Sequence, residues 1–349
     1  MELESHRQAS HRQTSHRQAR LSLPKIQAAL ATNGAELGVL KQFERLQPQF
    51  DIHIFDQLTS TSAQLWSMLE AGAGSGTVAI AHQQSAGRGQ RGRIWRSEPG
   101  GLYLSLALEP DWPVAHSAQL TCLSAWGIAI AFNNLGIPLK VKWPNDLFFE
   151  GKKLGGILTE TKLAHSTASS LVGENQAKPL PCIKQAVIGV GINWHNPVPE
   201  TGITLQKILE GNPNLYAKTK INCLEMLAAL VLKGILQGVF FQQQVGSQVF
   251  MKVYERLLTQ VGKTVSVDND LLKLATPASV AHTAHVLRMK EGQFGNHSGE
   301  VLGVSEEGYL RVAVQRGAFE PWSEAPSEHV VLLKPTETLF VGEAVDRVD

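Results

Sequence analysis

The sequence has few cysteines and almost no net charge. Its 349 residues include only three cysteines, Cys122, Cys182 and Cys223, which lie far apart in the chain. This odd number argues against a disulfide framework and fits a reducing compartment, and no Cys/His spacing indicates a zinc site. Lys and Arg total 32 against 31 for Asp and Glu. No global field favours nucleic acid or a membrane surface, so any affinity for anions is local.

Long apolar runs are missing as well. The runs at 120–132 and 227–232 are too short to span a bilayer, and the N-terminus lacks the apolar core of a secretory signal. Its Ser, Arg and Gln content is compatible with a transit peptide, but Glu2 and Glu4 weigh against one. The hydrophobic fraction of 43% and mean hydropathy of −0.08 are typical of a soluble globular protein. We expect a cytoplasmic protein without a membrane partner.

Composition along the chain divides it into four parts. Residues 1–20 contain three copies of S-H-R-Q-A/T without a large apolar residue, which predicts a disordered tail. Residues 21–49 have short apolar patches and are expected to form a linker with one helix. Residues 50–260 form the main domain. Short β-type runs in 261–349 predict a small all-β domain.

The main domain alternates strand-like and helical segments, which predicts an α+β sheet. A polar stretch rich in Ser and Pro, 163–181, is expected to be a hairpin loop or insertion. The expected strands are 51–55, 78–81, 102–108, 140–142 and 187–193, and the expected helices are 61–71, 116–135 and several within 205–257.

The segment 87–95 is the most informative of the chain. Three arginines alternate with three glycines and the segment ends at Trp95. Glycines allow close approach of the backbone to a ligand, and guanidinium groups bind phosphate or carboxylate oxygens. Several arginines in one tight turn are costly to bury unpaired. The segment is predicted to bind an anion, with an exposed basic loop as the alternative.

The same segment also contains the spacing G-x-G-x-x-G. A dinucleotide-binding turn requires a helix to begin at these glycines. The continuation, 93–101, is polar, contains Pro99 and ends in a double glycine. Because no amphipathic helix can be drawn through it, we reject a nicotinamide-dependent oxidoreductase.

Two charged residues, Lys153 and Asp146, each have a structural and a functional interpretation. Lys153 begins the apolar, glycine-containing run 153–160. It either snorkels at the edge of the strand or neutralises a bound anion. Asp146 follows a strand that stops at Trp143-Pro144-Asn145. Its carboxylate either caps this turn or holds Mg²⁺ near a nucleotide.

Polar and aromatic side chains outside the arginine segment have two interpretations too. Ser60, Thr61 and Ser62 are candidates for helix caps, or with Gln84 for hydrogen bonds to a small polar heterocycle. Trp95 and Trp143 either wall an apolar pocket or pack in the core.

In combination these segments resemble the biotin protein ligases. The family's arginine-glycine loop ending in Trp is similar to 87–95, and its Lys-Trp-Pro-Asn-Asp block stands intact at 142–146. Its Lys-Leu-x-Gly-Ile-Leu strand is similar to 153–158, and its Gly-x-Gly-Ile-Asn strand to 189–193. The four blocks occur in the family's order.

The resemblance implies a fold and a reaction. The fold is a central mixed β-sheet with helices, of the class II synthetase type, followed by a small SH3-like β-barrel domain. Biotin carboxylate attacks the α-phosphate of ATP in the presence of Mg²⁺, giving biotinyl-5′-AMP and pyrophosphate. A lysine of a biotin carboxyl carrier protein, an acetyl-CoA carboxylase subunit, then attacks the mixed anhydride.

The resemblance also implies roles for individual residues. Lys153, Arg88 and Asp146 carry the chemistry, with Asp146 as the Mg²⁺ ligand. The residues expected around biotin are Ser60, Thr61, Ser62, Gln84, Arg88, Gly89, Gln90, Lys153, Gly155, Gly156, Gly189 and Gly191. Those expected around ATP and the adenylate are Arg88, Arg91, Arg93, Trp95, Asn145, Lys153 and Asn193.

Two other functions remain open on the sequence. A lipoate or octanoate ligase or transferase of the same kind of fold would use Lys153 equally well, but the arginine-rich loop and the block at 142–146 favour biotin. A non-enzymatic biotin-sensing regulator is the second alternative. Related repressors carry an N-terminal winged helix, and 21–46 has no such pattern. We therefore expect no specific DNA binding. An exposed strand edge offers pairing with a second copy or with the acceptor, and the sequence does not choose.

The chain departs from the family at two positions. Family members often have Asn where this chain has Ser62, so one contact to biotin or its pocket is weakened. They often have arginine where this chain has Gln90, which removes a cation from the loop that retains the adenylate. We expect Gln90→Arg to slow dissociation of the adenylate, because it adds a guanidinium beside the phosphate. Dissociation is measured by trapping released biotinyl-5′-AMP, and an unchanged rate would contradict the expectation.

Overall fold

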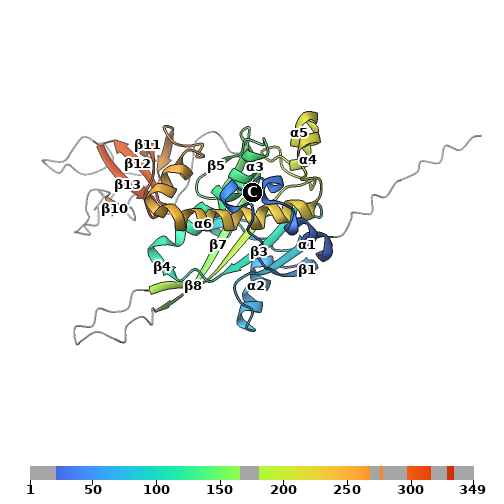
Figure 1. The fold of residues 1–349 in the computed structure, drawn as a ribbon. Coiled ribbons are helices and arrows are strands. Elements are labelled where there is room, and N and C mark those ends of the chain that lie inside the picture. The colour runs from blue at the N-terminus through green and yellow to red at the C-terminus, as the bar shows by residue number, and fades with distance from the viewer. Residues whose placement is uncertain (1–20, 166–180, 268–275, 278–296, 316–327, 334–349) are drawn as a thin grey trace, which may run out of the picture.

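A computed structural model describes residues 21–165, 181–267, 276–277, 297–315 and 328–333. The predicted tail at 1–20 and most of the expected insertion at 163–181 lie outside these residues. In the ribbon view, a twisted sheet carries helices on both faces, and a smaller sheet lies at one end (Figure 1).

The large sheet is mixed, in agreement with the expected fold. Its strands follow the order β1-β2-β3-β8-β7-β6-β5, with the short β4 pairing with β8. β1 and β2 are parallel, and the other neighbours are antiparallel. The strands are β1 (Asp51–Leu58), β2 (Thr77–Gln84), β3 (Leu102–Leu108), β4 (Trp112–Pro113), β5 (Lys140–Lys142), β6 (Asp146–Phe149), β7 (Lys152–His165) and β8 (Pro181–Ile192).

The helices include two that are long and apolar. They are α1 (Leu23–Ala31), α2 (Thr61–Glu70), α3 (Ser117–Asn134), α4 (Leu205–Glu210), α5 (Pro213–Lys218) and α6 (Leu224–Glu255). By length and composition, Val114–Asn134 and Leu224–Glu255 resemble membrane spans, but 72% and 67% of their most apolar windows are buried inside the structure. They contain the two apolar runs noted in the sequence, and they are core helices.

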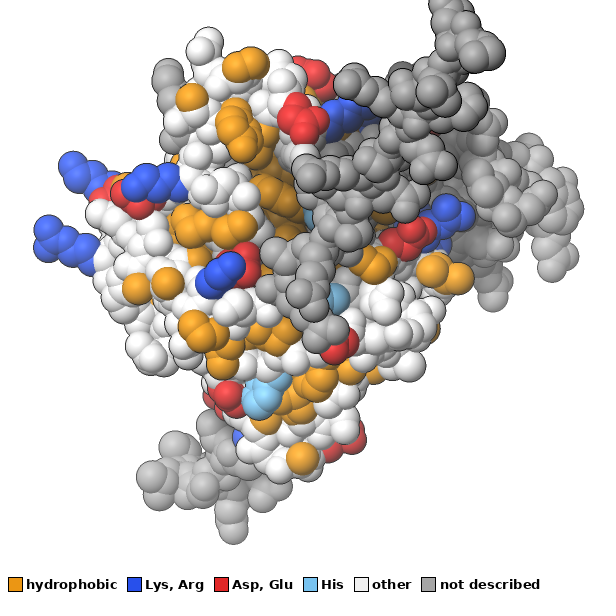
Figure 2. Space-filling model, turned by 90° about the vertical axis from the view of Figure 1, so that its right-hand side faces the viewer, with side chains coloured by type: hydrophobic (Ala, Val, Ile, Leu, Met, Phe, Trp, Pro, Cys, Tyr) orange, Lys and Arg blue, Asp and Glu red, His pale blue; other side chains and the backbone are white. Residues whose placement is uncertain are grey.

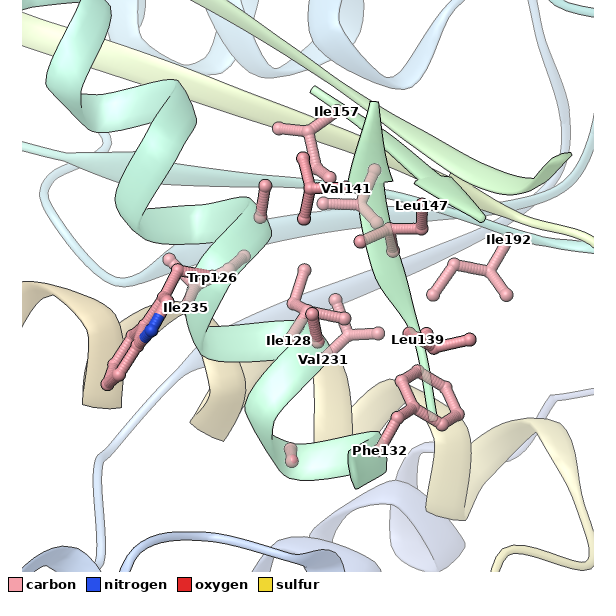
Figure 3. Packing of buried hydrophobic residues seen from close by; sticks show 14 of the residues in the cluster. Trp126, Ile128, Phe132, Leu139, Val141, Leu147, Ile157, Ile192, Val231 and Ile235 are labelled. Atoms are coloured by element: carbon pink, nitrogen blue, oxygen red, sulfur yellow. The ribbon is translucent and has the colours of Figure 1, made fainter. Parts of the chain in front are cut away.

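Alternation along the strands explains why helices cover both faces of the sheet. Val78 and Ile80 on β2 belong to the cluster formed with α1, α3 and α6, whereas Ala79 packs with Leu65 and Leu69 of α2. Successive side chains of a strand point to opposite faces, so a continuous apolar strand serves two helical layers. Figure 3 shows the larger cluster, where Trp126, Ile128 and Phe132 of α3 lie among side chains of the sheet and α6.

Residues 21–49 are part of this core rather than a separate connection. α1 packs against α6, and Ile26, Leu37 and Phe43 are buried in the same cluster as the sheet. The expected helix is present, and its apolar face contributes to the main domain.

The C-terminal strands form a second, antiparallel sheet with the order β10-β13-β12-β11-β9, which is consistent with an SH3-like domain. The turn before β12 reaches the main domain, where the Trp143 indole N–H donates to the Gly308 carbonyl oxygen at 3.1 Å. The strands are β9 (Thr264–Val267), β10 (Thr276–Pro277), β11 (His297–Val304), β12 (Leu310–Gln315) and β13 (Glu328–Leu333).

The crossing of α3 and α6 depends on glycines. A Cβ atom at Gly127 would collide with the carbonyl oxygen of Gly234, and one at Gly238 would collide with that of Leu123. Because the obstructing atoms are backbone, the two helices can approach this closely only without these side chains.

We expect Gly127→Ala to lower the free energy of unfolding by about 1–3 kcal/mol, because the helices must move apart. Gly74→Ala is the matched control, since a Cβ there meets no atom within 4 Å. Chemical denaturation of the two variants and the wild type measures the difference. Equal stability of both variants would contradict the glycine contact.

Candidate functional site

A cleft of about 740 Å³, including the space open to solvent, lies on the α2 side of the large sheet. It gathers segments that are far apart in the sequence, from the start of α2 to the end of β8. The lining residues are Ser60, Thr61, Ser62, Gln84, Arg88, Gly89, Gln90, Arg93, Ile94, Trp95, Asn145, Asp146, Lys153, Gly156, Ile157, Leu158, Gly189, Val190 and Gly191. Most of the residues expected to bind biotin or the adenylate therefore meet in one place.

The floor of the cleft is formed by glycine-containing stretches of β7 and β8. β7 and β8 pair so that Gly156 lies opposite Gly191, and Leu158 lies opposite Gly189. A Cβ at Gly191 would collide with the Trp95 indole nitrogen, and one at Gly189 would come within 2.8 Å of Ser62 Oγ. The small residues of β8 thus leave room for side chains of the arginine loop and α2, as well as for the cleft.

A lysine and a carboxylate face each other in the cleft. Lys153 Nζ lies 2.7 Å from Asp146 Oδ1, and the two side chains are 32% and 21% exposed. The same ammonium lies 5.2 Å from the centroid of the Trp95 ring, at a distance that permits a cation–π interaction. Lys153 is therefore held inside the cleft, and the alternative of snorkelling at a strand edge does not apply.

Hydroxyl and amide groups form a connected network near the start of α2. Gln84 Oε1 accepts hydrogen bonds from the Thr61 N–H at 2.8 Å and from Thr61 Oγ1 at 3.2 Å. Ser105 Oγ donates to Thr61 Oγ1 at 2.8 Å and hydrogen-bonds Ser62 Oγ at 3.0 Å. Gln84 Nε2 donates to Ser97 Oγ at 2.7 Å. This network fixes several polar atoms in buried positions.

The helix-cap interpretation of the first hydroxyls is confirmed for the position of Ser60 but not for its side chain. Ser60 occupies the N-cap position of α2, but its side chain makes no capping hydrogen bond within the described structure. Ser60, Thr61 and Ser62 are all buried and line the cleft. The hydroxyls of Thr61 and Ser62 belong to the network, and the backbone N–H of Thr61 is bound by Gln84.

The arginine loop crosses the opening of the cleft. The Gly89 N–H donates to the Arg93 carbonyl oxygen at 2.7 Å, which closes the tight turn 89–93. Arg88 Nη2 donates to Glu160 Oε2 at 3.0 Å. No helix begins after Gly92 in the described loop, since a short 3₁₀ turn at Gln90–Gly92 is followed by extended backbone. The rejection of a dinucleotide-binding turn is confirmed.

Three of the expected residues do not line the cleft. Arg91 is exposed on the outer side of the loop with φ 59°. A Cβ at Gly155 would point at the carbonyl oxygen of Gly191, between the strands. The Asn193 amide donates to backbone oxygens of Lys153 and Ile203 at 3.4 and 3.3 Å, so it fixes the start of β7. The expected ligand contacts of all three residues stay predictions. The hydrogen bonds of Asn193 show that this residue also has a structural role.

The turn that carries Asp146 is anchored from the C-terminal part of the chain. The Tyr254 hydroxyl donates to the Pro144 carbonyl oxygen at 2.8 Å, and the Trp143 N–H donates to Gln260 Oε1 at 2.9 Å. Burial, with Cys122 and Asp146 nearby, raises the pKa of Tyr254 well above its usual value, so the hydroxyl stays protonated as a donor. Trp143 is 2% exposed and packs in the core, so only Trp95 of the two tryptophans walls the cleft.

The apolar wall and two polar residues were not predicted from the sequence. Ile94, Ile157, Leu158 and Val190 line the cleft. Ser105 was missed although it is a polar residue in an apolar strand, and Glu160 was missed although it follows Gly156 and Leu158 at alternate positions of β7. Both signals are visible in the period of two along a strand.

Acidic ligands for a metal are scarce in the cleft. Among the described residues, no group of three or more His, Cys, Asp or Glu side chains is placed to hold a metal ion. Asp146 is the carboxylate that lines the cleft. A single carboxylate fits Mg²⁺ that arrives with phosphate oxygens and keeps its waters, and it does not fit an all-protein metal cage.

The face of the molecule in Figure 2 carries mixed charges. Its described Lys and Arg side chains stand singly, and most of them lie beside an acidic side chain (Figure 2). This arrangement agrees with the balanced composition of the chain.

Comparison with known proteins finds similarity to one family over part of the chain. Residues 54–174 match the model of the Biotin/lipoate A/B protein ligase family. The Bifunctional ligase/repressor BirA of Bacillus subtilis is 35% identical over 140 residues, which are 40% of this chain and 38% of that protein. The Biotin–[acetyl-CoA-carboxylase] ligase of Paracoccus denitrificans is 31% identical over 140 residues, covering 38% of this chain and 50% of that protein.

A structural likeness covers more of the chain. The biotin protein ligase from Aquifex aeolicus, solved in complex with biotin and ATP, aligns with a TM-score of 0.53 and 22% identity over 80% of this chain and 98% of that one. The matched part of this chain spans half or less of those two curated relatives. Residues 54–174 are therefore similar to the Biotin/lipoate A/B protein ligase family, and the chain has the fold of the Aquifex aeolicus biotin protein ligase.

Proposed function

We propose that this protein is a biotin protein ligase, which activates biotin with ATP and transfers it to a lysine of a carrier protein. One observation carries the proposal: the cleft joins a buried hydroxyl and amide network at one side to the Lys153–Asp146 pair and the arginine loop at the other. A substrate with a polar heterocycle and a carboxylate at its two ends matches this order of groups.

The side chains have distinct tasks in the first half-reaction. Ser60, Thr61, Ser62 and Gln84 bind the ureido group of biotin by hydrogen bonds. Lys153 exchanges its contact with Asp146 for the biotin carboxylate and the α-phosphate, and neutralises the charge that develops between them. A preorganised ammonium beside the low-polarity face of Trp95 stabilises this charge more than water does.

The arginine loop retains the product of that step. Arg88, Gly89, Gln90 and Arg93 line the opening of the cleft. Closing over the adenylate excludes water from the mixed anhydride, which would otherwise hydrolyse it. The carrier's lysine amine attacks the biotinyl carbonyl carbon, the C–O bond to the phosphate breaks, and AMP leaves.

Mg²⁺ belongs to this proposal as the ion that would accompany ATP. Asp146 would hold it together with phosphate oxygens, and the ion would neutralise charge on the phosphates. Asn145 would support this side of the cleft: its amide donates to the Ile157 carbonyl oxygen at 2.6 Å, which joins the Asp146 turn to β7.

The name of one relative suggests the partner. A relative is named for acetyl-CoA carboxylase, and the biotin carrier subunit of that enzyme is the proposed acceptor here. We infer that the reaction occurs in the cytoplasm without specific DNA binding. The edge of the large sheet is also proposed as a surface at which a second copy of the chain could pair to form a homodimer.

A lipoate or octanoate ligase is the competing function within the family. Such substrates end in a dithiolane or an alkyl chain, which cannot satisfy buried hydroxyl and amide groups. The network around Thr61 and Gln84 therefore favours biotin.

Incubation of the full chain with ATP and Mg²⁺ tests the substrate. Separate samples contain biotin, lipoate or octanoate, and mass spectrometry detects the acyl-adenylate. We expect biotinyl-5′-AMP in the first sample only. An adenylate of either fatty acid would move the chain to the lipoate branch, and no adenylate in any sample would contradict a ligase.

Lys153→Met tests the proposed charge neutralisation. We expect a loss of at least about 100-fold in the adenylation rate, since one preorganised donor to a developing anion typically contributes 10²–10³-fold. Lys152→Met is the matched control, because Lys152 is the exposed neighbouring residue and does not line the cleft. Equal adenylation rates for both variants, with both folded by circular dichroism, would contradict the role of Lys153.

A further inference from the structure

Glu160 lies on the cleft face of β7 without being part of the expected site. Gly156 and Leu158 line the cleft, and Glu160 is the next residue with the same orientation along the strand. It pairs with Val187 of β8, which packs against α2. Its carboxylate therefore stands where the rim of the cleft meets α2.

Two elements converge on this carboxylate. Glu160 Oε2 accepts a hydrogen bond from Arg88 Nη2 at 3.0 Å and another from the Trp66 indole N–H at 3.3 Å. Trp66 belongs to α2 and packs against the cluster of Leu65, Leu69 and Val187. The indole thus ties the carboxylate to the rigid part of the domain.

The contact to Arg88 joins this rigid part to the arginine loop. Arg88 is 46% exposed and Glu160 is 27% exposed, so the guanidinium is the freer partner. Arg88 lines the cleft in this same position. A guanidinium has five N–H donors, and Glu160 engages one nitrogen, so donors remain for an anion in the cleft.

We propose that Glu160 is a positioning residue that holds Arg88 at the wall of the cleft, with the remaining N–H groups directed at the adenylate. The inference rests on the proposed function, since the anion is the phosphate of biotinyl-5′-AMP. It assigns the retention of this intermediate to a Trp66–Glu160–Arg88 chain that connects α2, β7 and the loop. Because Arg88 is ordered before the ligand arrives, less side-chain entropy is lost on binding.

The neighbouring pair provides a matched control. Lys162 Nζ lies 2.7 Å from Glu70 Oε1, so the same strand and the same helix are joined by a second ion pair. Glu70 is 67% exposed and does not line the cleft, while Lys162 itself also lies 4.8 Å from the centroid of the Trp66 ring. Glu70→Gln removes an equivalent charge without touching Arg88.

The first measurement is the dissociation rate of biotinyl-5′-AMP from the preloaded enzyme. For a partly exposed ion pair, we expect Glu160→Gln to accelerate release about two- to fivefold, and Glu70→Gln to leave the rate unchanged. Arg88→Ala is expected to accelerate release further. Adding Glu160→Gln to Arg88→Ala is expected to have no additional effect, because the two residues act through one contact.

The second measurement needs no ligand and therefore separates this inference from the proposed function. Trypsin cleaves after Arg91 and Arg93, and mass spectrometry follows these two cuts in the unliganded protein. We expect faster cleavage in Glu160→Gln than in the wild type, equal cleavage in Glu70→Gln, and no added effect of Glu160→Gln in the Arg88→Ala background.

Each outcome decides the inference. Unchanged cleavage in Glu160→Gln would show that the carboxylate does not hold the loop. Slower release of the adenylate would show that Glu160 competes with the ligand for Arg88, and additive effects in the double variant would show independent action. All three results overturn the positioning role. If the wild type forms no adenylate, the proposed function fails while the cleavage experiment still tests the contact.

Discussion

The contact among Lys153, Asp146 and Trp95 is the constraint on which the site depends. Lys153 is the second residue of β7, Asp146 begins β6 and Trp95 ends the arginine loop. The ammonium lies 2.7 Å from the carboxylate and 5.2 Å from the centroid of the indole ring. A lysine that lacked these partners would be expelled toward solvent, because an isolated ammonium is costly to bury. Asp146 and Trp95 therefore keep the Lys153 ammonium inside the cleft, above the glycine-containing stretches of β7 and β8.

The glycine strands make that contact accessible. Gly191 lies under the Trp95 indole, and Gly156 lies beside Asp146 Oδ1 and the Lys153 side chain. A side chain at either position would separate the loop from the strands. The glycines leave space in the middle of the cleft. The hydroxyl network lies at one end and the Lys153–Asp146 pair at the other, so the cleft can bind a substrate whose two ends differ in chemistry.

The C-terminal part of the chain stabilises the site at a distance. Tyr254 near the end of α6, Gln260 after it and Gly308 in the turn before β12 all bind the Trp143–Pro144 segment. The carboxylate of Asp146 follows two residues later in the chain. The second sheet is therefore attached to the main domain at the turn that carries a proposed catalytic group. Helix α6 supports this turn through Tyr254 and also packs in the core beneath the large sheet.

The sequence by itself determined most strands of the large sheet, the long helix α3 and most of the lining of the cleft, because these features depend on local periodicity and on short contiguous blocks. Residues such as Arg88, Asp146, Lys153 and Gly191 belong to such blocks. Tertiary structure alone decided that Trp143 faces the core, that the Ser60 side chain does not cap α2, and that 21–49 completes the main core. It also decided the contact of Glu160 with Arg88, 72 residues away in the chain. Contacts of this kind depend on strand register and on which layer covers each face, and neither is encoded by the neighbouring residues.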